Sequence, residues 1–386
     1  MCIRDSSGTS AEKVEGLKHI WGRTDLIPLW VADMDFATAP FVTDAIRKRC
    51  ENEVLGYTGK PDSYYNAIIN WVKQRYDLVV AKEMINFVPG IVPGIGMAMN
   101  CFTQKGDKVM IQPPVYHPFA WVTTRNERTL VTNPLKWENG MYRMDLDTFR
   151  EQIKGCKLFI LCNPHNPGGV VWTEAELRAI ADICYDEKVL VFSDEIHADL
   201  TLPPHTHRPF ATVSEKARMN SVTFMSPSKA FNMPGLSASH ALIFNEDLRK
   251  RFRIYMDAGE LDMGHVFAFL SVEAAYSHGT EWLDQCLAYI QGNIDFVDDF
   301  LKNHAPKIKA IRPEASYLVW LDCRELKLSQ KDLNEFFVDK AHLALNDGEM
   351  FGKEGIGFMR LNVASPRCII EKAMKQLADA YQLYIK

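Results

Sequence analysis

Five short apolar runs in the middle of the chain constrain its fold more than any other feature. They are dense in Val, Ile, Leu and Phe with little alternation, and they lie at residues 108–112, 157–162, 189–192, 222–225 and 241–244. Continuous apolar runs of this kind are typical of strands that are covered on both faces. Between two of them, Thr173 and Glu176 form a capping-box pattern, which predicts a helix over residues 173–188. The repeated strand–helix–strand order predicts an α/β fold with a mainly parallel sheet covered by helices.

The C-terminal part of the chain shows a different pattern. We expect a long helix over residues 281–303, strands over 315–322 and 357–362, and helices over 330–340 and from 366 to the end. This mixture predicts a smaller α+β domain, with the boundary near the long helix. The division that we predict is a large domain of residues 41–285 and a small domain of residues 7–40 and 286–386. The opening residues 1–6, MCIRDS, fit no element and belong to neither.

Composition argues against several classes of protein. Lys and Arg total 44 and Asp and Glu total 49, so the net charge of −5 disfavours nucleic acid as a partner. The longest apolar stretch, residues 87–99, contains prolines and glycines and is too short to cross a membrane. No secretory signal pattern is visible. The nine cysteines form no CxxC pair, so we expect buried free thiols, a cytoplasmic location and no metal site.

Polar side chains follow three of the predicted strands, at the edge where parallel sheets bind ligands. Lys229 follows the run at 222–225, Asn163 and Asn166 follow the run at 157–162, and Asp194 and His197 follow the run at 189–192. Taken singly, each has an ordinary interpretation as a surface lysine, a turn residue or a helix cap. Taken together, they place an amine, an amide and a carboxylate at one edge of one sheet.

A Gly/Pro-rich turn at residues 88–96 precedes an expected helix at 97–102. Small residues at a helix start expose backbone N–H groups to an anion, although this signal is weak by itself. With the lysine, the carboxylate and the amide, it completes the set that pyridoxal phosphate requires. The lysine bonds the cofactor, the carboxylate keeps the ring nitrogen protonated, and the helix start holds the phosphate.

The motifs that carry these residues are similar to those of a known family. SPSKAFN, NPHNPGG and SDEIH resemble, in order and spacing, the fold-type I pyridoxal-phosphate enzymes of the aminotransferase class I/II group. LIPLWVADMDF, GYTG, SYLVWLDCREL and GFMRLNVASPR resemble the MalY/PatB-type cystathionine β-lyases, also called C–S lyases. The resemblance extends from about Gly8 to the end of the chain. It implies a fold-type I transferase fold with a large and a small domain.

The resemblance implies roles around the cofactor ring. Lys229 matches the lysine that bonds the cofactor and moves the substrate Cα proton, and Asp194 matches the partner of the ring nitrogen. Asn166 matches the asparagine near the ring hydroxyl and the substrate carboxylate. His197 stands where many aminotransferases have a tyrosine. Tyr116 matches the aromatic residue that stacks on the ring, with a plain core aromatic as the alternative.

Further roles concern the phosphate and the substrate. The backbone of Ile91 and Val92 and the side chain of Ser226 match groups that hold the phosphate, and Arg360 matches the arginine that binds the substrate α-carboxylate. Tyr57 matches a tyrosine that reaches the phosphate of a neighbouring subunit, which implies a homodimer; a packed turn tyrosine is the alternative. Where many relatives have a phosphate-binding arginine, this chain has Ser237, so we expect weaker cofactor retention.

The implied reaction is β-elimination from L-cystathionine or a related cysteine S-conjugate, which yields a thiol, pyruvate and ammonia. An aminotransferase of the same fold is the alternative, because both reactions use every residue named above. A protein that keeps the pocket only to bind a regulatory partner is a third possibility. The residues leave these alternatives open, and the resemblance favours elimination.

Overall fold

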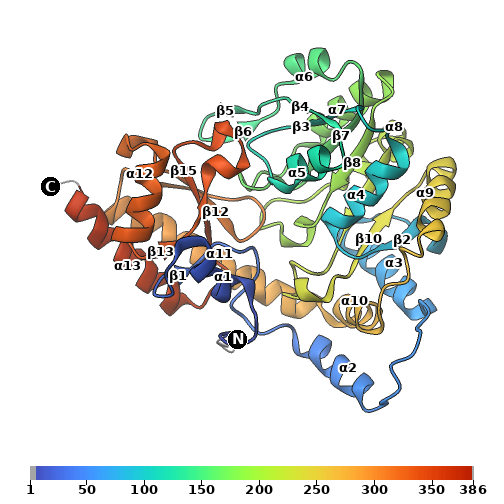
Figure 1. The fold of residues 1–386 in the computed structure, drawn as a ribbon, viewed down its shortest axis with the longest axis horizontal. Helices are drawn as coiled ribbons and strands as arrows, with labels where there is room; N and C mark the ends of the chain where they lie inside the picture. The colour runs from blue at the N-terminus through green and yellow to red at the C-terminus, as the bar shows by residue number, and fades with distance from the viewer. Residues whose placement is uncertain (1–5, 385–386) are drawn as a thin grey trace.

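The computed structural model describes residues 6–384, so the prediction for the first five residues lies outside the described part. A seven-stranded sheet forms the centre of the larger part of the molecule (Figure 1). Its neighbouring strands are, in order, β2 (Ile85–Val88), β10 (Ser239–Leu242), β9 (Ser221–Met225), β8 (Leu190–Asp194), β7 (Cys156–Cys162), β3 (Lys108–Ile111) and β4 (Thr129–Thr132). Each of the five apolar runs forms a strand of this sheet, which confirms the predicted α/β fold.

The sheet is mainly parallel, with one antiparallel strand. Strands β9, β8, β7, β3 and β4 run parallel to one another, whereas β10 is antiparallel to both β9 and β2. The antiparallel direction follows from the short connection after β9, which turns back through residues 226–238 without a crossover helix.

Helices cover both faces of the sheet, as the continuous apolar strands require. Successive strand residues point to opposite faces: Val191 of β8 packs into one buried cluster and Phe192 into another. One face is covered by α4 (Ile91–Phe102), α5 (Pro118–Arg125) and α9 (Glu246–Ala258). The other face is covered by α3 (Asp62–Tyr76), α6 (Leu146–Gln152), α7 (Glu174–Asp186), α8 (Glu215–Met219) and α10 (Val266–His278).

Two helix starts show how local sequence sets the element bounds. In α7, the Glu176 N–H donates to the Thr173 hydroxyl and the Glu176 carboxylate accepts from the Thr173 N–H, which confirms the capping box. In α4, the prediction of a turn through residue 96 was wrong, because the helix begins at Ile91. Pro93 is tolerated in its first turn, where a backbone N–H has no intrahelical partner.

The smaller part of the molecule is built on a four-stranded antiparallel sheet (Figure 1). Its strands are β11 (Lys309–Ile311), β12 (Leu318–Asp322), β15 (Phe358–Asn362) and β14 (Asn346–Asp347). The helices of this part are α1 (Glu12–Trp21), the long α11 (Thr280–His304), α12 (Gln330–Glu335) and α13 (Arg367–Tyr384). The predicted helix over 330–340 is divided, because α12 passes into a π-helical turn at Phe336–Lys340.

Remaining elements are short and peripheral. The N-terminal strand β1 (Ile27–Pro28) pairs in parallel with β13 (Leu343–Ala344), which attaches the first part of the chain to the smaller part of the molecule. Helix α2 (Pro40–Cys50) contacts α10, and β5 (Lys136–Glu138) pairs with β6 (Met141–Arg143).

The cysteines are free thiols where the structure describes them. Burial is confirmed for Cys156, Cys162, Cys184, Cys286 and Cys323, whereas Cys50 and Cys368 are exposed. Within residues 6–384 no helix has the length and apolarity that crossing a membrane requires. The same residues contain no group of three or more His, Cys, Asp or Glu side chains arranged to hold a metal ion.

Candidate active site

A cavity of about 210 Å³ lies at the carboxyl ends of β7, β8 and β9. Its lining includes Lys229, Asp194, Asn166, His197 and Tyr116, together with Ile91 and Val92 at the start of α4. The tertiary structure therefore brings together in one cavity seven of the residues that the sequence singled out.

Asp194 is the last residue of β8, and its carboxylate is buried. Its Oδ1 accepts a hydrogen bond from the backbone N–H of Ile196 at 3.1 Å. Burial raises the pKa of Asp194 to about 7, since one backbone N–H does not replace the water that a carboxylate loses. A cationic group in the cavity would favour the charged form and relieve this cost.

Lys229 follows β9 after a short turn and points into the same cavity. Its Nζ donates to the carbonyl oxygen of Ala32 at 2.6 Å. The pKa of the Lys229 amine is lowered to about 8, mainly by burial; Asp33 and Asp194 oppose this shift, and the Arg360 charge contributes to it. A substantial neutral fraction of this amine is therefore available near neutral pH, as a nucleophile or base requires.

Arg360, from the centre of β15, is a buried cation beside the cavity. One Nη donates to Oδ1 of Asn166 at 3.1 Å, and the other donates to the carbonyl of Trp30 at 3.1 Å and to Asn346. The guanidinium also lies over the ring of Phe351, with 4.9 Å to the ring centroid. Burial lowers the pKa of Arg360 to about 10, so the side chain stays charged at neutral pH.

The start of α4 forms one wall of the cavity, with the geometry that anion binding requires. Gly90 precedes the helix with φ at +125°, a conformation that L side chains rarely adopt, and Ile91 and Val92 follow it in the cavity wall. The first N–H groups of a helix have no intrahelical partner and carry a partial positive charge. Ser237 and Ser239 line the same cavity and add hydroxyl groups.

His197 and Tyr116 occupy other walls of the cavity. Nδ1 of His197 is buried without a hydrogen-bond partner, and burial lowers the pKa of its imidazole to about 3, so the ring is neutral. Tyr116 is partly buried, and its ring packs edge-to-face against the ring of Phe119, with the two ring centroids 5.7 Å apart. One face of a flat ligand could therefore meet an aromatic ring in this cavity.

Two of the expected residues lie elsewhere. The Ser226 hydroxyl donates to the carbonyl of Ala238 at 2.7 Å and accepts from the Ser228 N–H at 3.1 Å, and it is Ser228 that lines the cavity. Tyr57 is 98% exposed in this single chain, on an extended segment between α2 and α3 that runs along the periphery (Figure 1).

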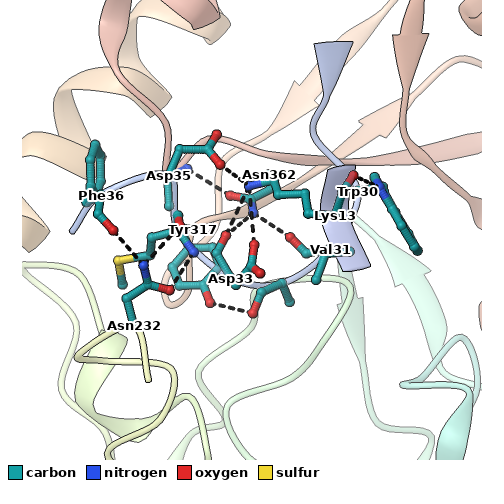
Figure 2. A network of polar contacts seen from close by, with 12 residues as sticks. Lys13, Trp30, Val31, Asp33, Asp35, Phe36, Asn232, Tyr317 and Asn362 are labelled. Carbon is teal, nitrogen blue, oxygen red and sulfur yellow. Dashed lines mark hydrogen bonds and ion pairs between the residues drawn. The ribbon is translucent and has the colours of Figure 1, made fainter. Parts of the chain in front are cut away.

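Sequence reasoning missed a set of residues that hold one wall of the cavity. Ala32 lines the cavity, and the side chains of Asn232, Tyr317 and Asn362 bind the backbone around it (Figure 2). The motifs WVADMDF and SYLVWLDCREL contained Ala32 and Tyr317, but no local pattern in them indicates that they meet.

The fold and the cavity at the strand ends define a class of protein, and sequence comparison agrees with it. Residues 24–377 match the family model described as aminotransferase class I and II. The chain belongs to this family.

Its relatives include named lyases. Over 375 residues, and 97% of each chain, it is 37% identical to cystathionine beta-lyase PatB of Bacillus subtilis. It superposes with a TM-score of 0.96 on cystalysin from Treponema denticola, which contains pyridoxal 5'-phosphate, at 33% identity over 100% and 99% of the two chains. With the PLP-bound C-S lyase from Staphylococcus hominis the TM-score is 0.91, at 35% identity over 98% and 97% of the chains.

Proposed function

We propose that this protein is a pyridoxal-phosphate-dependent carbon–sulfur lyase. Its reaction is β-elimination from L-cystathionine or a related cysteine S-conjugate. The observation that carries the proposal is that Lys229, with its lowered pKa, and the buried Asp194 face one cavity beside the Arg360–Asn166 pair. The full-length similarity to PatB, a cystathionine beta-lyase, supports elimination over transamination.

The residues of the cavity fit the cofactor. The start of α4 with Ser237 and Ser239 would hold a phosphate, and Tyr116 would stack on the ring. The buried Asp194 carboxylate would pair with a protonated ring nitrogen, and the neutral His197 would lie near the ring substituents. Bonded to the substrate amine in place of Lys229, the cofactor would withdraw electrons from the substrate Cα and make the Cα proton acidic, and Lys229 would be left as a free amine.

The protein's own residues perform two tasks in this reaction. Arg360, whose planar fork matches a carboxylate, binds the substrate α-carboxylate together with Asn166, and this fixes the orientation of the Cα–H bond. The neutral amine of Lys229 accepts the Cα proton. The Cβ–S bond then breaks and the thiolate leaves, and the remaining three-carbon unit takes up water to give pyruvate and ammonia.

A homodimer is part of the proposal. Tyr57 and its neighbours Val54 and Leu55 are 98%, 74% and 57% exposed, although large apolar side chains are usually buried. A second copy of the chain would cover this segment and place Tyr57 at the partner's phosphate.

Pyruvate release from L-cystathionine, with pyridoxal phosphate supplied and no keto acid present, tests the function. We expect sustained release by the wild type and none by Lys229→Ala. Activity that depends strictly on an added keto acid would contradict elimination and indicate transamination. Pyruvate release by Lys229→Ala would contradict the assigned role of the lysine.

A further inference from the structure

One wall of the cavity is a backbone segment without helix or strand hydrogen bonding over most of its length. This segment, residues 30–36, is here called the strap, and Figure 2 shows it between the two parts of the molecule. Irregular backbone that is partly buried requires other partners for its carbonyl groups, since an unpaired buried carbonyl is costly. In the strap, side chains supply these partners.

Five side chains besides Lys229 hold the strap carbonyls, and one of them is Lys13, whose Nζ donates to the Asp33 oxygen at 3.3 Å. Arg360 donates to the Trp30 oxygen, and Nδ2 of Asn362 donates to the oxygens of Val31 and Asp33, at 2.6 Å each. Nδ2 of Asn232 donates to the oxygens of Met34 and Phe36, at 2.9 and 2.7 Å. Tyr317 donates to the oxygen of Ala32 at 2.9 Å.

The Ala32 carbonyl is the point where the strap meets the reacting group. It accepts from Lys229 Nζ at 2.6 Å and from the Tyr317 hydroxyl at 2.9 Å. A neutral amine has two N–H groups and one lone pair, so an N–H donated to Ala32 restricts the lone pair to the two remaining tetrahedral directions of the nitrogen. A base acts efficiently only when its lone pair is aligned with the proton that it removes.

We propose that the Ala32 carbonyl orients the free amine of Lys229, and that Tyr317 and Asn362 are positioning residues that hold this carbonyl in place. The inference rests on the proposed function, because it concerns the lysine that removes the Cα proton.

The surroundings of Tyr317 and Asn362 support a fixed position for the carbonyl. Tyr317 is fully buried, and burial raises the pKa of its phenol well above the ordinary value, so the hydroxyl keeps the proton that it donates. Asn362 is also buried, and its Oδ1 accepts from the Ala364 N–H at 2.8 Å, which fixes the orientation of its amide. The carbonyls of Val31 and Asp33 on either side of Ala32 are thereby fixed by one side chain.

Tyr317→Phe is the first test, since it removes the hydroxyl and keeps the ring. We expect kcat and the exchange of the substrate Cα hydrogen with solvent to fall about tenfold, while KM stays close to the wild-type value because Arg360 is intact. The matched control is Tyr384→Phe, whose hydroxyl donates to the Leu326 carbonyl at 2.9 Å outside the site. We expect no change in kcat, KM or exchange for this control.

A second readout does not depend on turnover. Cofactor-free protein is mixed with pyridoxal phosphate, and the covalent bond to Lys229 is trapped with borohydride and counted by mass spectrometry over time. We expect Tyr317→Phe to bond the cofactor several-fold more slowly than the wild type and Tyr384→Phe, with a similar melting temperature for all three. Equal bonding and exchange rates in Tyr317→Phe and the wild type would overturn the proposal.

Asn362→Ala tests the second positioning residue, and it replaces Tyr317→Phe as the test of the proposal if that variant does not fold. Its matched control is Asn293→Ala, because Nδ2 of Asn293 also donates to two carbonyls, those of Val363 and Ser365. We expect slower exchange and bonding only for Asn362→Ala, and equal losses in both variants would contradict the proposal. An inactive wild type would refute the proposed function instead, and the trapping rates would still test the inference.

Discussion

Asp194 and Lys229 share one cavity, and burial moves their pKa values toward each other. The pKa of Asp194 rises to about 7 and that of Lys229 falls to about 8, because each charged form loses contact with water. In the cofactor-free protein these pKa shifts correspond to a free-energy cost of burying the two charged groups, and a bound ligand of suitable charge would reduce this cost. At the residue scale, the site is therefore built for an occupant that brings a positive charge to Asp194.

This cost makes the stability of the cofactor-free protein depend on pH. Asp194 binds a proton up to about pH 7 when folded, but only up to its ordinary pKa of 3.8 when unfolded. Between these values the folded state binds more protons, so its contribution to stability falls as pH rises, by at most about 1.4 kcal/mol per pH unit. Asp194→Asn removes this dependence.

We therefore expect the melting temperature of cofactor-free Asp194→Asn, relative to that of the cofactor-free wild type, to increase as pH rises from about 4 to about 7. Thermal unfolding followed by circular dichroism at several pH values measures the difference. Asp322→Asn is the control, because the pKa of that carboxyl is lowered, not raised, beside Arg324. A difference between Asp194→Asn and wild type that stays constant across the range would contradict the assigned burial cost.

At the scale of the element, the start of α4 is the phosphate site that we propose. The turn between β2 and α4 depends on Gly90, whose φ of +125° exposes the first N–H groups of the helix to the cavity. A Cβ at Gly90 would meet Pro93 at 3.4 Å, an ordinary contact, so the backbone conformation and not space requires glycine there.

Gly90→Ala should therefore strain this turn by about 1–3 kcal/mol. We expect this strain to weaken cofactor binding and to raise Kd about ten- to a hundredfold. Gly292→Ala is the control, because it lies within α11 and its Cβ would meet only Arg367 at 3.5 Å. Titration of cofactor-free protein with pyridoxal phosphate, followed by absorbance, gives both affinities. Equal affinities in the two variants would count against the helix start as the phosphate site.

At the scale of the whole molecule, the site depends on segments that are far apart in the sequence. The strap, β9 with Lys229, and the smaller sheet with Arg360 and Tyr317 meet around one cavity. The exposed residues Val54, Leu55 and Tyr57 contribute nothing to the lining of this cavity. They belong to the extended segment between α2 and α3 (Figure 1). In the proposed dimer, each site would be completed by the partner's copy of this segment.

Mixed dimers test this arrangement. Tyr57→Phe and Lys229→Ala are each expected to lower activity as homodimers, the first by weaker phosphate retention with the fold intact. A mixed dimer has one site with both residues intact if Tyr57 acts across the interface, so we expect co-refolding of the two variants to restore activity. If Tyr57 acts within its own chain or not at all, mixing restores nothing, and unchanged cofactor affinity in Tyr57→Phe would also contradict the role.

Local sequence patterns predicted most of the fold for identifiable reasons. Continuous apolar runs predicted the strands because both faces of the large sheet are covered, and the Thr173–Glu176 capping box predicted the start of α7. The prediction failed at α4, where prolines and glycines indicate a turn although the first helical turn accepts Pro93. It also did not reveal that β10 runs antiparallel, since strand direction depends on the connection and not on the strand.

By itself, the sequence determined five of the seven strands of the large sheet, the family and the polar residues at the strand ends, because these follow from patterns within short segments; the edge strand β4 and the strand β2 were not predicted. The tertiary structure alone decided which groups meet: the Ala32 carbonyl with Lys229 and Tyr317, and Arg360 with Asn166. These contacts join residues that lie far apart in the chain, and they form because buried donors and carbonyls must find partners once water is excluded. The burial that lowers the pKa of Lys229 has the same origin, since the groups around its amine, among them Ala32 and Asp194, come from distant parts of the chain.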